Sequence, residues 1–361
     1  MTPDPGLACW LQLTLTPGIS ASGLRDLLKR FGLPEAVLSH PRSSLSGFVP
    51  AQAIGALDSE EVARAVDSAM AWAGQPGNAI VTLADAAYPA ALLEIPDPPA
   101  LLYLRGRTEL LSATSLAIVG SRNATTQGER DAERFAQAFS AAGLTIVSGM
   151  AQGIDAAAHR GGLAAKGSTI AVLGTGVDIL YPKKNTMLGE RIAGEGLLVS
   201  EFALATPAIA YNFPRRNRLI SGLSRGCLVV EAALASGSLI TARTAAEQGR
   251  DVFAMPGSIH SPLSKGCHAL IKTGAKLVES AEDVLGELPG SRQLRTTRGA
   301  DTRDTAPGDP LLAHMGHGPV DVDSLCARAG RSADEIAADL LRLELAGHVA
   351  ALPGGLFQRL N

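Results

Sequence analysis

From residue 116 to residue 278 the chain alternates short apolar runs with alanine-rich stretches of helical periodicity. Continuous runs of Val, Ile, Leu and Ala are typical of parallel strands buried on both faces. The runs lie near residues 117–119, 144–147, 169–173, 197–200, 227–231 and 252–254. This alternation predicts an α/β fold with a doubly wound parallel sheet, an extended Rossmann-like arrangement. Two more strand-like runs, 79–83 and 101–104, are expected to add strands to its edge.

The 361 residues leave room for several domains. We expect a small helical domain similar to SAM and helix-hairpin-helix domains at 1–75, the Rossmann-like domain at 76–287, a flexible linker at 288–309 and a winged helix at 310–361. The linker prediction rests on a run of Gly, Pro, Ser, Thr, Arg and Asp without an apolar face. The last segment has three helical patterns followed by a hairpin pattern, which is typical of a winged helix.

Neither flanking domain is strongly cationic. The turn at Pro17-Gly18-Ile19 could donate backbone N–H groups to a phosphate, and a plain tight turn in a helical bundle explains it equally well. In the third helix of the winged domain a single arginine, Arg342, stands against Asp334, Glu335, Asp339 and Glu344. A helix that enters the DNA groove needs cations that face phosphate. We therefore expect the winged helix to contact protein.

Composition narrows the class of protein. The formal net charge is −3 and 46% of residues are hydrophobic, so the chain is globular and any affinity for DNA depends on a local patch. The four cysteines form no C-x-x-C pair, and no metal site is predicted. No leader peptide or membrane-spanning run is recognisable, so we expect a cytoplasmic protein without membrane contact.

Polar, glycine-containing turns follow three of the predicted strands, where helix N-termini offer N–H groups to anions. Such turns suit a phosphorylated ligand because glycine lets a ligand approach the backbone closely and Arg122 adds a forked donor. The candidate binding residues in these turns are Gly120, Ser121, Arg122, Gly149, Ser236, Gly237 and Ser238.

A block of cations follows a single aromatic residue in a chain with only 4% aromatics. The pairing of a stacking ring with nearby arginines is typical of single-strand sites. The alternative is that Phe213 belongs to the core and the arginines are solvated. Lys183 could extend the patch or be an ordinary surface lysine. The candidates are Lys183, Phe213, Arg215, Arg216, Asn217 and Arg218.

Catalytic motifs are missing from the sequence. The turn at Gly120 does not match the G-x-G-x-x-G fingerprint of dinucleotide enzymes, and no P-loop, G-x-S-x-G or H-E-x-x-H motif is present. His159, His260 and His268 have no evident carboxylate or nucleophile partner. We expect a protein that is not an enzyme and that needs no cofactor.

Many of these motifs, in this order, resemble the DNA-processing protein DprA (Smf) family. The resemblance runs from about residue 88 to residue 285. It rests on 118–122 (IVGSR), 148–155 (SGMAQGID), 174–176 (GTG), 200–201 (SE), 213–218 (FPRRNR), 221–224 (SGLS) and 236–242 (SGSLITA).

The resemblance implies a non-catalytic protein that binds single-stranded DNA. It implies that the protein protects incoming strands during natural transformation (competence) and homologous recombination, loads the recombinase RecA onto them and displaces single-strand-binding protein. It also implies a homodimer. By the same resemblance Arg122 would hold phosphate or base edges, Phe213 would stack a base and the arginines that follow would line the backbone path. The dimer or partner face would include His268, Leu270 and Ile271.

Two other functions remain open at this point. Nucleotide-processing phosphoribohydrolases have a similar fold, and Glu231 could serve as their glutamate, although the preceding loop lacks the Gly-Gly-x-Gly-Thr run of those enzymes. A protein that binds a small nucleotide signal in the sheet pocket is the third possibility.

Overall fold

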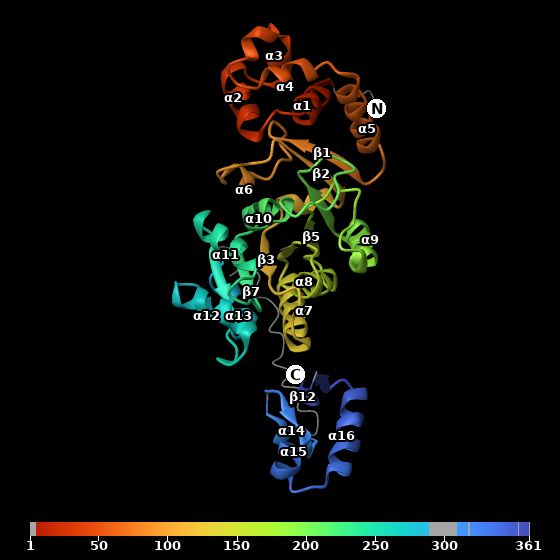
Figure 1. Ribbon diagram of the computed structural model, residues 1–361, viewed down its shortest axis with the longest axis vertical. Coiled ribbons are helices and arrows are strands. Elements are labelled where there is room, and N and C mark those ends of the chain that lie inside the picture. The colour runs from red at the N-terminus through yellow and green to blue at the C-terminus, as the bar shows by residue number, and fades with distance from the viewer. Residues whose placement is uncertain (1–4, 289–308, 317, 353, 361) are drawn as a thin grey trace. The chain divides into compact units, whose positions relative to one another are not determined.

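The computed structural model describes residues 5–288, 309–316, 318–352 and 354–360 (Figure 1). These residues form two compact units, one with the N-terminal helices and the large sheet, the other with the C-terminal domain. Nearly all of the linker predicted at 288–309 lies outside the described residues.

The large sheet has nine strands in the order β1-β2-β6-β5-β4-β3-β7-β8-β9. The seven strands β3 to β9, which run from β6 to β9 in the sheet order, pair in parallel with one another. β1 and β2 add antiparallel strands at the edge next to β6. The predicted doubly wound fold and the predicted edge strands are therefore confirmed. The strands are β1 Asn78–Thr82, β2 Leu101–Gly106, β3 Ser115–Val119, β4 Thr145–Ser148, β5 Thr169–Val172, β6 Leu197–Ser200, β7 Gly226–Val229, β8 Asp251–Ala254 and β9 Lys276–Leu277.

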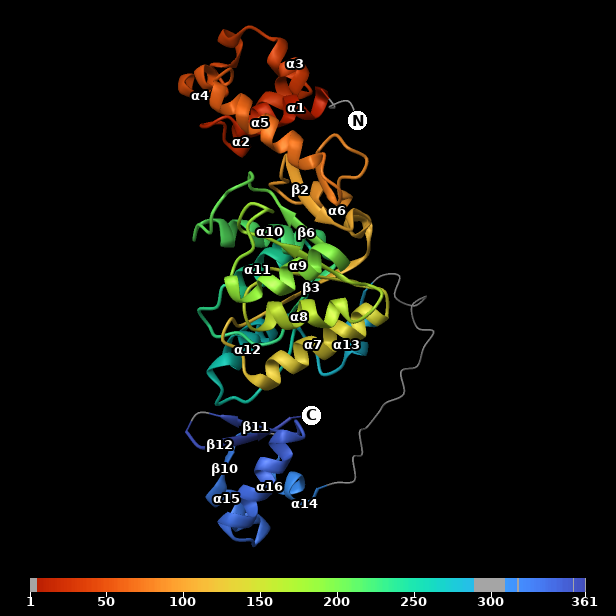
Figure 2. The ribbon, with the colours of Figure 1, turned by 90° about the vertical axis from the view of Figure 1, so that its right-hand side faces the viewer.

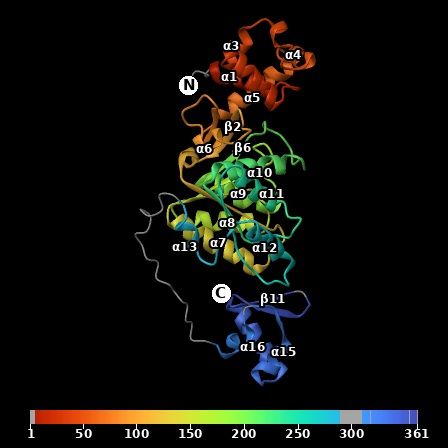
Figure 3. The same ribbon diagram turned by 90° about the vertical axis from the view of Figure 1, so that its left-hand side faces the viewer.

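Helices cover both faces of this sheet because the strands are apolar on both. In β3, Leu116 and Ile118 pack with α7 and α8, while Ala117 and Val119 pack with α10 and α11. Figures 2 and 3 show the two sides. On one side lie α7 Thr126–Ala141, α8 Ile154–Leu163, α9 Thr186–Glu195 and α13 Ala281–Leu285; on the other lie α6 Ala90–Leu93, α10 Asn212–Leu223, α11 Ser238–Glu247 and α12 Lys265–Lys272. The 3-10 helices are η1 Arg42–Leu45, η2 Thr108–Ser112, η3 Lys183–Asn185 and η4 Pro262–Ser264.

The N-terminal helices form a bundle that packs on the edge of the sheet. Its own core contains Leu13, Leu24 and Leu27, and Leu11 packs with Tyr103 of β2 in a shared core. Ser20 and Ser59 cap two of the helices by accepting bonds from backbone N–H groups. The helices are α1 Pro5–Leu15, α2 Ala21–Phe31, α3 Pro34–Ser39, α4 Ala51–Ala56 and α5 Glu60–Ala73.

The C-terminal unit is a winged helix, as predicted. A capping box between Ser332 and Glu335 begins its third helix, and a three-stranded antiparallel sheet in the order β10-β12-β11 forms the wing. Its elements are α14 Pro310–Met315, β10 Val320–Asp321, α15 Val322–Ala329, α16 Ala333–Leu345, β11 Val349–Leu352 and β12 Leu356–Arg359. None of the described helices in either unit is long and apolar enough to cross a membrane.

Candidate functional site

The order of the parallel strands reverses at β3. The chain places β4, β5 and β6 on one side of β3 and then returns to place β7, β8 and β9 on the other. In open α/β sheets ligands bind outside the carboxyl ends of the strands at such a switch point, because the flanking loops diverge there and leave a crevice.

A cavity of about 480 Å³ occupies this position. The turn after β3, the first two turns of α10 and the loop before α11 all contribute to its walls. This volume is typical of ligand-binding clefts. The predicted residues that line it are Gly120, Ser121, Arg122, Phe213, Arg216, Asn217, Ser236, Gly237 and Ser238. The other predicted binding residues, Gly149, Lys183, Arg215 and Arg218, do not line this cavity.

Arg122 is the accessible cation of the cavity. Its side chain is exposed, and within the described parts of the chain it makes no hydrogen bond or ion pair. Its charge lies close enough to Arg216 to lower the pKa of that guanidinium. An exposed cation that has no ion-pair partner among the described residues favours the binding of a negatively charged ligand.

Two of the predicted glycine turns, at Gly120 and Gly237, line the cavity. At Gly120 a Cβ atom would lie 2.6 Å from Ile154 Cγ1 and 2.9 Å from the Glu231 carbonyl oxygen, so the glycine makes room for the protein's own packing. Gly237 is exposed with open space around it. In that loop the N–H of Ser236 bonds the Ala233 carbonyl and that of Ser238 bonds the Ser236 hydroxyl. This leaves fewer amides for a phosphate than the sequence suggested.

The floor of the cavity is Arg216, a buried arginine that bonds the protein's own backbone. Arg216 is only 4% exposed. Its Nη1 donates to the Gly149 carbonyl at 2.7 Å and to the Val172 carbonyl, so it joins the ends of β4 and β5. Gly149 is also buried, and a Cβ there would lie 2.6 Å from the Arg216 guanidinium. The DNA contacts predicted for these two residues stay predictions.

A buried carboxylate balances Arg216. Asp155 accepts bonds from the N–H groups of Gly149 and Ala151, both at 3.2 Å. Burial raises the pKa of Asp155, and the Arg216 charge and these N–H groups oppose that rise. Burial lowers the pKa of Arg216 to about 10 despite the attraction of Asp155. Arg216 therefore stays charged at neutral pH and serves the structure of the site.

A neutral histidine lies behind this pair. The Thr169 hydroxyl donates to the Ile146 carbonyl, so it accepts from His159 Nδ1, 2.7 Å away, and the proton of the ring must be on Nδ1. Nε2 has no partner among the described residues. Burial, assisted by the charge of Arg216, lowers the pKa of His159 to about 3. The structural role expected for His159 agrees with this environment.

Arg215 and Arg218 point to a different side of α10 from Phe213, and their predicted place along a DNA backbone stays a prediction. Because residues three apart share a face of a helix, these two arginines meet at Glu201, at 3.3 Å and 2.6 Å. Phe213 and Arg216, also three apart, face the cavity. Burial raises the pKa of Glu201, and the two arginines oppose that rise.

Phe213 is half-buried at the cavity wall. Its ring occupies the space above Gly174, where a Cβ would lie 2.8 Å from Phe213 Cδ1, and it contacts Tyr181 with the ring centroids 5.6 Å apart. One part of the ring is thus packed, and the residue also lines the cavity, so the predicted stacking of a base on Phe213 stays a prediction.

The remaining candidates lie elsewhere. Lys183 is exposed in η3. In α12, His268 and Ile271 are partly exposed, whereas Leu270 packs into the core, so it offers a partner little surface. The Glu231 carboxyl lies against Gly128 of α7 and not in the lining of the cavity. The described residues contain no group of side chains that could hold a metal ion.

Comparison with known proteins identifies the family. The family model for DNA recombination-mediator protein A matches residues 79–289. The family model for the DprA winged helix domain matches residues 296–355. The chain belongs to the DprA family. Protein Smf of Escherichia coli is 45% identical over 300 residues, which covers 81% of this chain and 80% of that protein. The DNA processing protein DprA of Streptococcus pneumoniae is 49% identical over 206 residues, which covers 57% of this chain and 73% of that protein.

Solved DprA structures have the same fold. That of DprA from Streptococcus pneumoniae has a TM-score of 0.68 at 38% identity and covers 77% of this chain and 96% of that one. DprA from Helicobacter pylori, whose structure describes a single-stranded DNA binding mode, has a TM-score of 0.52 at 31% identity and covers 57% of this chain and 93% of that one. The family assigns the chain a role in DNA processing.

The residues predicted from the sequence omit two buried carboxylates, Asp155 in the lining of this cavity and Glu201 on the other side of α10. Both were visible as acidic residues directly after a strand or glycine turn, in the segments SGMAQGID and SE. An acidic residue at the end of a buried strand, with arginines elsewhere in the chain, is a signal for a buried ion pair.

Proposed function

We propose that this DprA-family protein binds single-stranded DNA, with little sequence preference, in the cavity at the carboxyl ends of β3 and β7. The observation that carries the proposal is Arg122, an accessible cation that forms no ion pair with the described residues and lines the same cavity as the half-buried ring of Phe213. A cation for phosphate and an aromatic face for any base are what non-specific single-strand sites require. The single-strand binding of the Helicobacter pylori relative supports the same function.

An electrophoretic shift with single- and double-stranded oligonucleotides of equal length tests this proposal. We expect preference for the single strand, because a stacked base must be free of its pairing partner. With about four phosphates neutralised, log K should fall against log salt with a slope of roughly −3. Equal affinity for duplex, or binding that does not respond to salt, would contradict the proposal.

We further propose that the protein is not an enzyme. The position of the Glu231 carboxyl, against α7 and apart from the lining of the cavity, favours this over a phosphoribohydrolase. Chromatography of nucleoside monophosphates after incubation with the protein is the test, and released base would overturn this part. Tight mononucleotide binding with weak oligonucleotide binding would instead favour a nucleotide-signal protein.

The recombination role of the family suggests what the bound strand is for. We propose that a homodimer of this protein presents the strand to the recombinase RecA, as in natural transformation. Formation of RecA filaments on DNA coated with single-strand-binding protein, with and without this protein, tests the loading step. Light scattering at several concentrations tests the dimer. If the protein does not accelerate filament formation, the proposed loading role is wrong, and the proposal that the protein binds single-stranded DNA is unaffected.

A further inference from the structure

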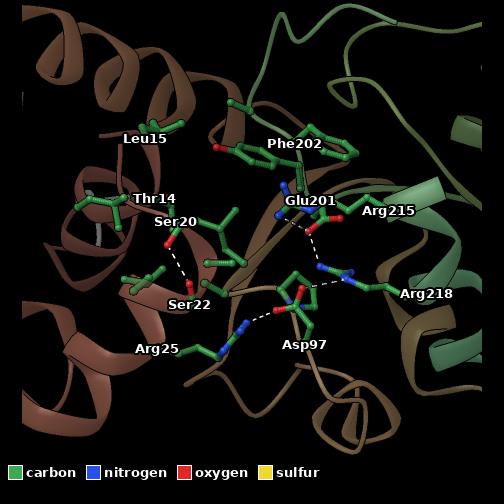
Figure 4. Close-up of a pocket in the computed structure, with 18 of the residues that line it drawn as sticks. Thr14, Leu15, Ser20, Ser22, Arg25, Asp97, Glu201, Phe202, Arg215 and Arg218 are labelled. Carbon is green, nitrogen blue, oxygen red and sulfur yellow. Dashed lines mark hydrogen bonds and ion pairs between the residues drawn. The ribbon is translucent and has the colours of Figure 1, made fainter. Parts of the chain in front are cut away.

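A second and larger cavity, of about 800 Å³, lies on the other side of α10 (Figure 4). Its walls come from the N-terminal helices and from the sheet domain, which share a core around Leu11 and Tyr103. Ser20, Ser22 and Arg25 line it from the N-terminal side, and Glu201, Phe202 and Arg215 line it from the sheet domain.

The charges of this second cavity are arranged in a chain. Arg25 pairs with Asp97, Asp97 is 3.4 Å from Arg218 Nε, and Arg218 pairs with Glu201 at 2.6 Å. Glu201 therefore has a closer partner than Arg215, which is 3.3 Å away. Three guanidinium groups face two carboxylates, an excess of one positive charge. Arg215 is 39% exposed and is the cation that can turn to an anion without leaving a buried carboxylate unpaired.

Aromatic rings accompany this cation. Arg215 Cζ lies 5.7 Å from the ring centroid of Phe202, which holds the guanidinium over a fixed surface. Tyr211 also lines the second cavity, and 74% of it is exposed. An exposed tyrosine of this kind has no role in the core and gives a flat face on which a base can stack.

The two cavities meet at the start of α10, where Pro214 lines both of them. Phe213 faces the first cavity, and Tyr211, two residues earlier, faces the second. We propose that the second cavity is a further subsite for the same single-stranded DNA, in which Arg215 binds a phosphate and Tyr211 stacks a base beyond the strand held at Arg122. This inference rests on the proposed function and extends it to the surface shared with the N-terminal helices.

The test compares oligothymidylates of two lengths, about four and about sixteen nucleotides, which bracket the usual size of single-strand sites. In the Tyr211→Ala/Arg215→Ala double variant we expect the affinity for the long strand to fall about tenfold or more. The slope of log K against log salt should become less negative by about 0.7. The affinity for the short strand should stay unchanged.

Arg191→Ala is the matched control, because Arg191 is an exposed arginine paired with Glu195 and lines neither cavity. Equal affinity of the double variant and the Arg191→Ala control for the long strand would overturn the second subsite. Equal losses on both lengths would also overturn it, because they would show a general effect on the first cavity. If the unaltered protein binds neither length, the proposed function itself fails, and that result is distinct from both.

Discussion

The cavity at β3 and α16 of the winged helix both combine arginines with carboxylates, but they pair them differently. In α16 the only arginine, Arg342, bonds Asp309 and Asp339, and Arg331, just before the helix, also bonds Asp339. In the cavity the balancing happens underneath, where Asp155 and backbone carbonyls surround Arg216. Arg122 remains accessible above them.

The difference shows that the partner of a cation decides what the cation can bind. A phosphate beside α16 must displace a carboxylate that already holds each arginine, and both arginines lower the pKa of Asp339 by stabilising its charge. A phosphate beside Arg122 displaces no carboxylate of the described residues. Counting arginines along the sequence does not separate these two cases. Matched substitutions, one in each region, do separate them.

The largest effect is expected at the floor of the cavity. Arg216→Met leaves Asp155 buried without its cation and should lower the free energy of unfolding by about 3–5 kcal/mol. Arg342→Met, at an exposed pair screened by solvent, should cost much less. Chemical denaturation followed by circular dichroism measures both. Similar small losses of unfolding free energy in the two variants would show that the charge of Arg216 does not stabilise the floor of the cavity.

The ring at the cavity wall comes next. Phe213→Ala should weaken binding of an oligothymidylate by about 1–3 kcal/mol through the loss of a stacked base. Phe135→Ala is the matched control, since Phe135 is also half-buried but lies in α7 and does not line the cavity. Fluorescence titration gives the affinities, and circular dichroism shows whether each variant folds. An unfolded Phe213→Ala variant, or a control that loses as much affinity, would assign Phe213 to the core alone.

The two regions should also respond to acid at different pH. His159 has a folded pKa of about 3, below its ordinary value of 6.5, so the unfolded state takes up its proton first. The sheet domain should therefore lose up to about 1.4 kcal/mol per pH unit as pH falls below 6.5. Asp339 has a lowered pKa, so its contribution to the winged helix is present above its ordinary value of 3.8 and is lost only as pH falls through the folded pKa.

Unfolding curves of the unaltered protein and of His159→Asn between pH 7 and about 5 test this window. Asparagine keeps a donor near Thr169 and removes the titrating group, so the variant should show a flatter pH dependence. The same slope in both proteins would show that His159 is not the group that responds.

The smallest effect is expected from the winged helix as a whole. Deleting residues 300–361 should leave single-strand affinity within about threefold, or under about 0.7 kcal/mol, because Arg342 of α16 and Arg331 just before the helix are already paired. The electrophoretic shift of the truncated protein measures this. A tenfold loss of single-strand affinity would show that the winged helix contacts DNA. The two regions would then not differ in the way described above.

Much of the fold follows from the sequence, since strands buried on both faces appear as continuous apolar runs. The runs at 144–147 and 197–200 coincide with β4 and β6 within a residue. The short helices α3 and α4 were not predicted, because six residues after a proline carry too little periodicity.

The membership of the site was predictable in part and its arrangement was not. The sequence brought Arg122, Phe213 and Ser236 to one edge of the sheet, as the cavity shows. It does not separate Arg215 from Phe213, because the cation block forms the first two turns of α10 and residues two apart on a helix face different directions. The helical period sends Arg215 to Glu201, and that contact spans 14 positions of the chain, so local pattern carries little information about it.

Substituting one arginine in each region tests the central claim most directly. Titration of an oligothymidylate against Arg122→Ala and Arg342→Ala, at several salt concentrations, compares two variants with the same change in net charge. We expect Arg122→Ala to lose about tenfold or more in affinity, because a charge-assisted phosphate contact is removed, and its salt slope to become less negative by about 0.7. Arg342→Ala should behave as the unaltered protein. Equal affinities and equal slopes in the two variants would contradict a DNA site at the carboxyl ends of β3 and β7.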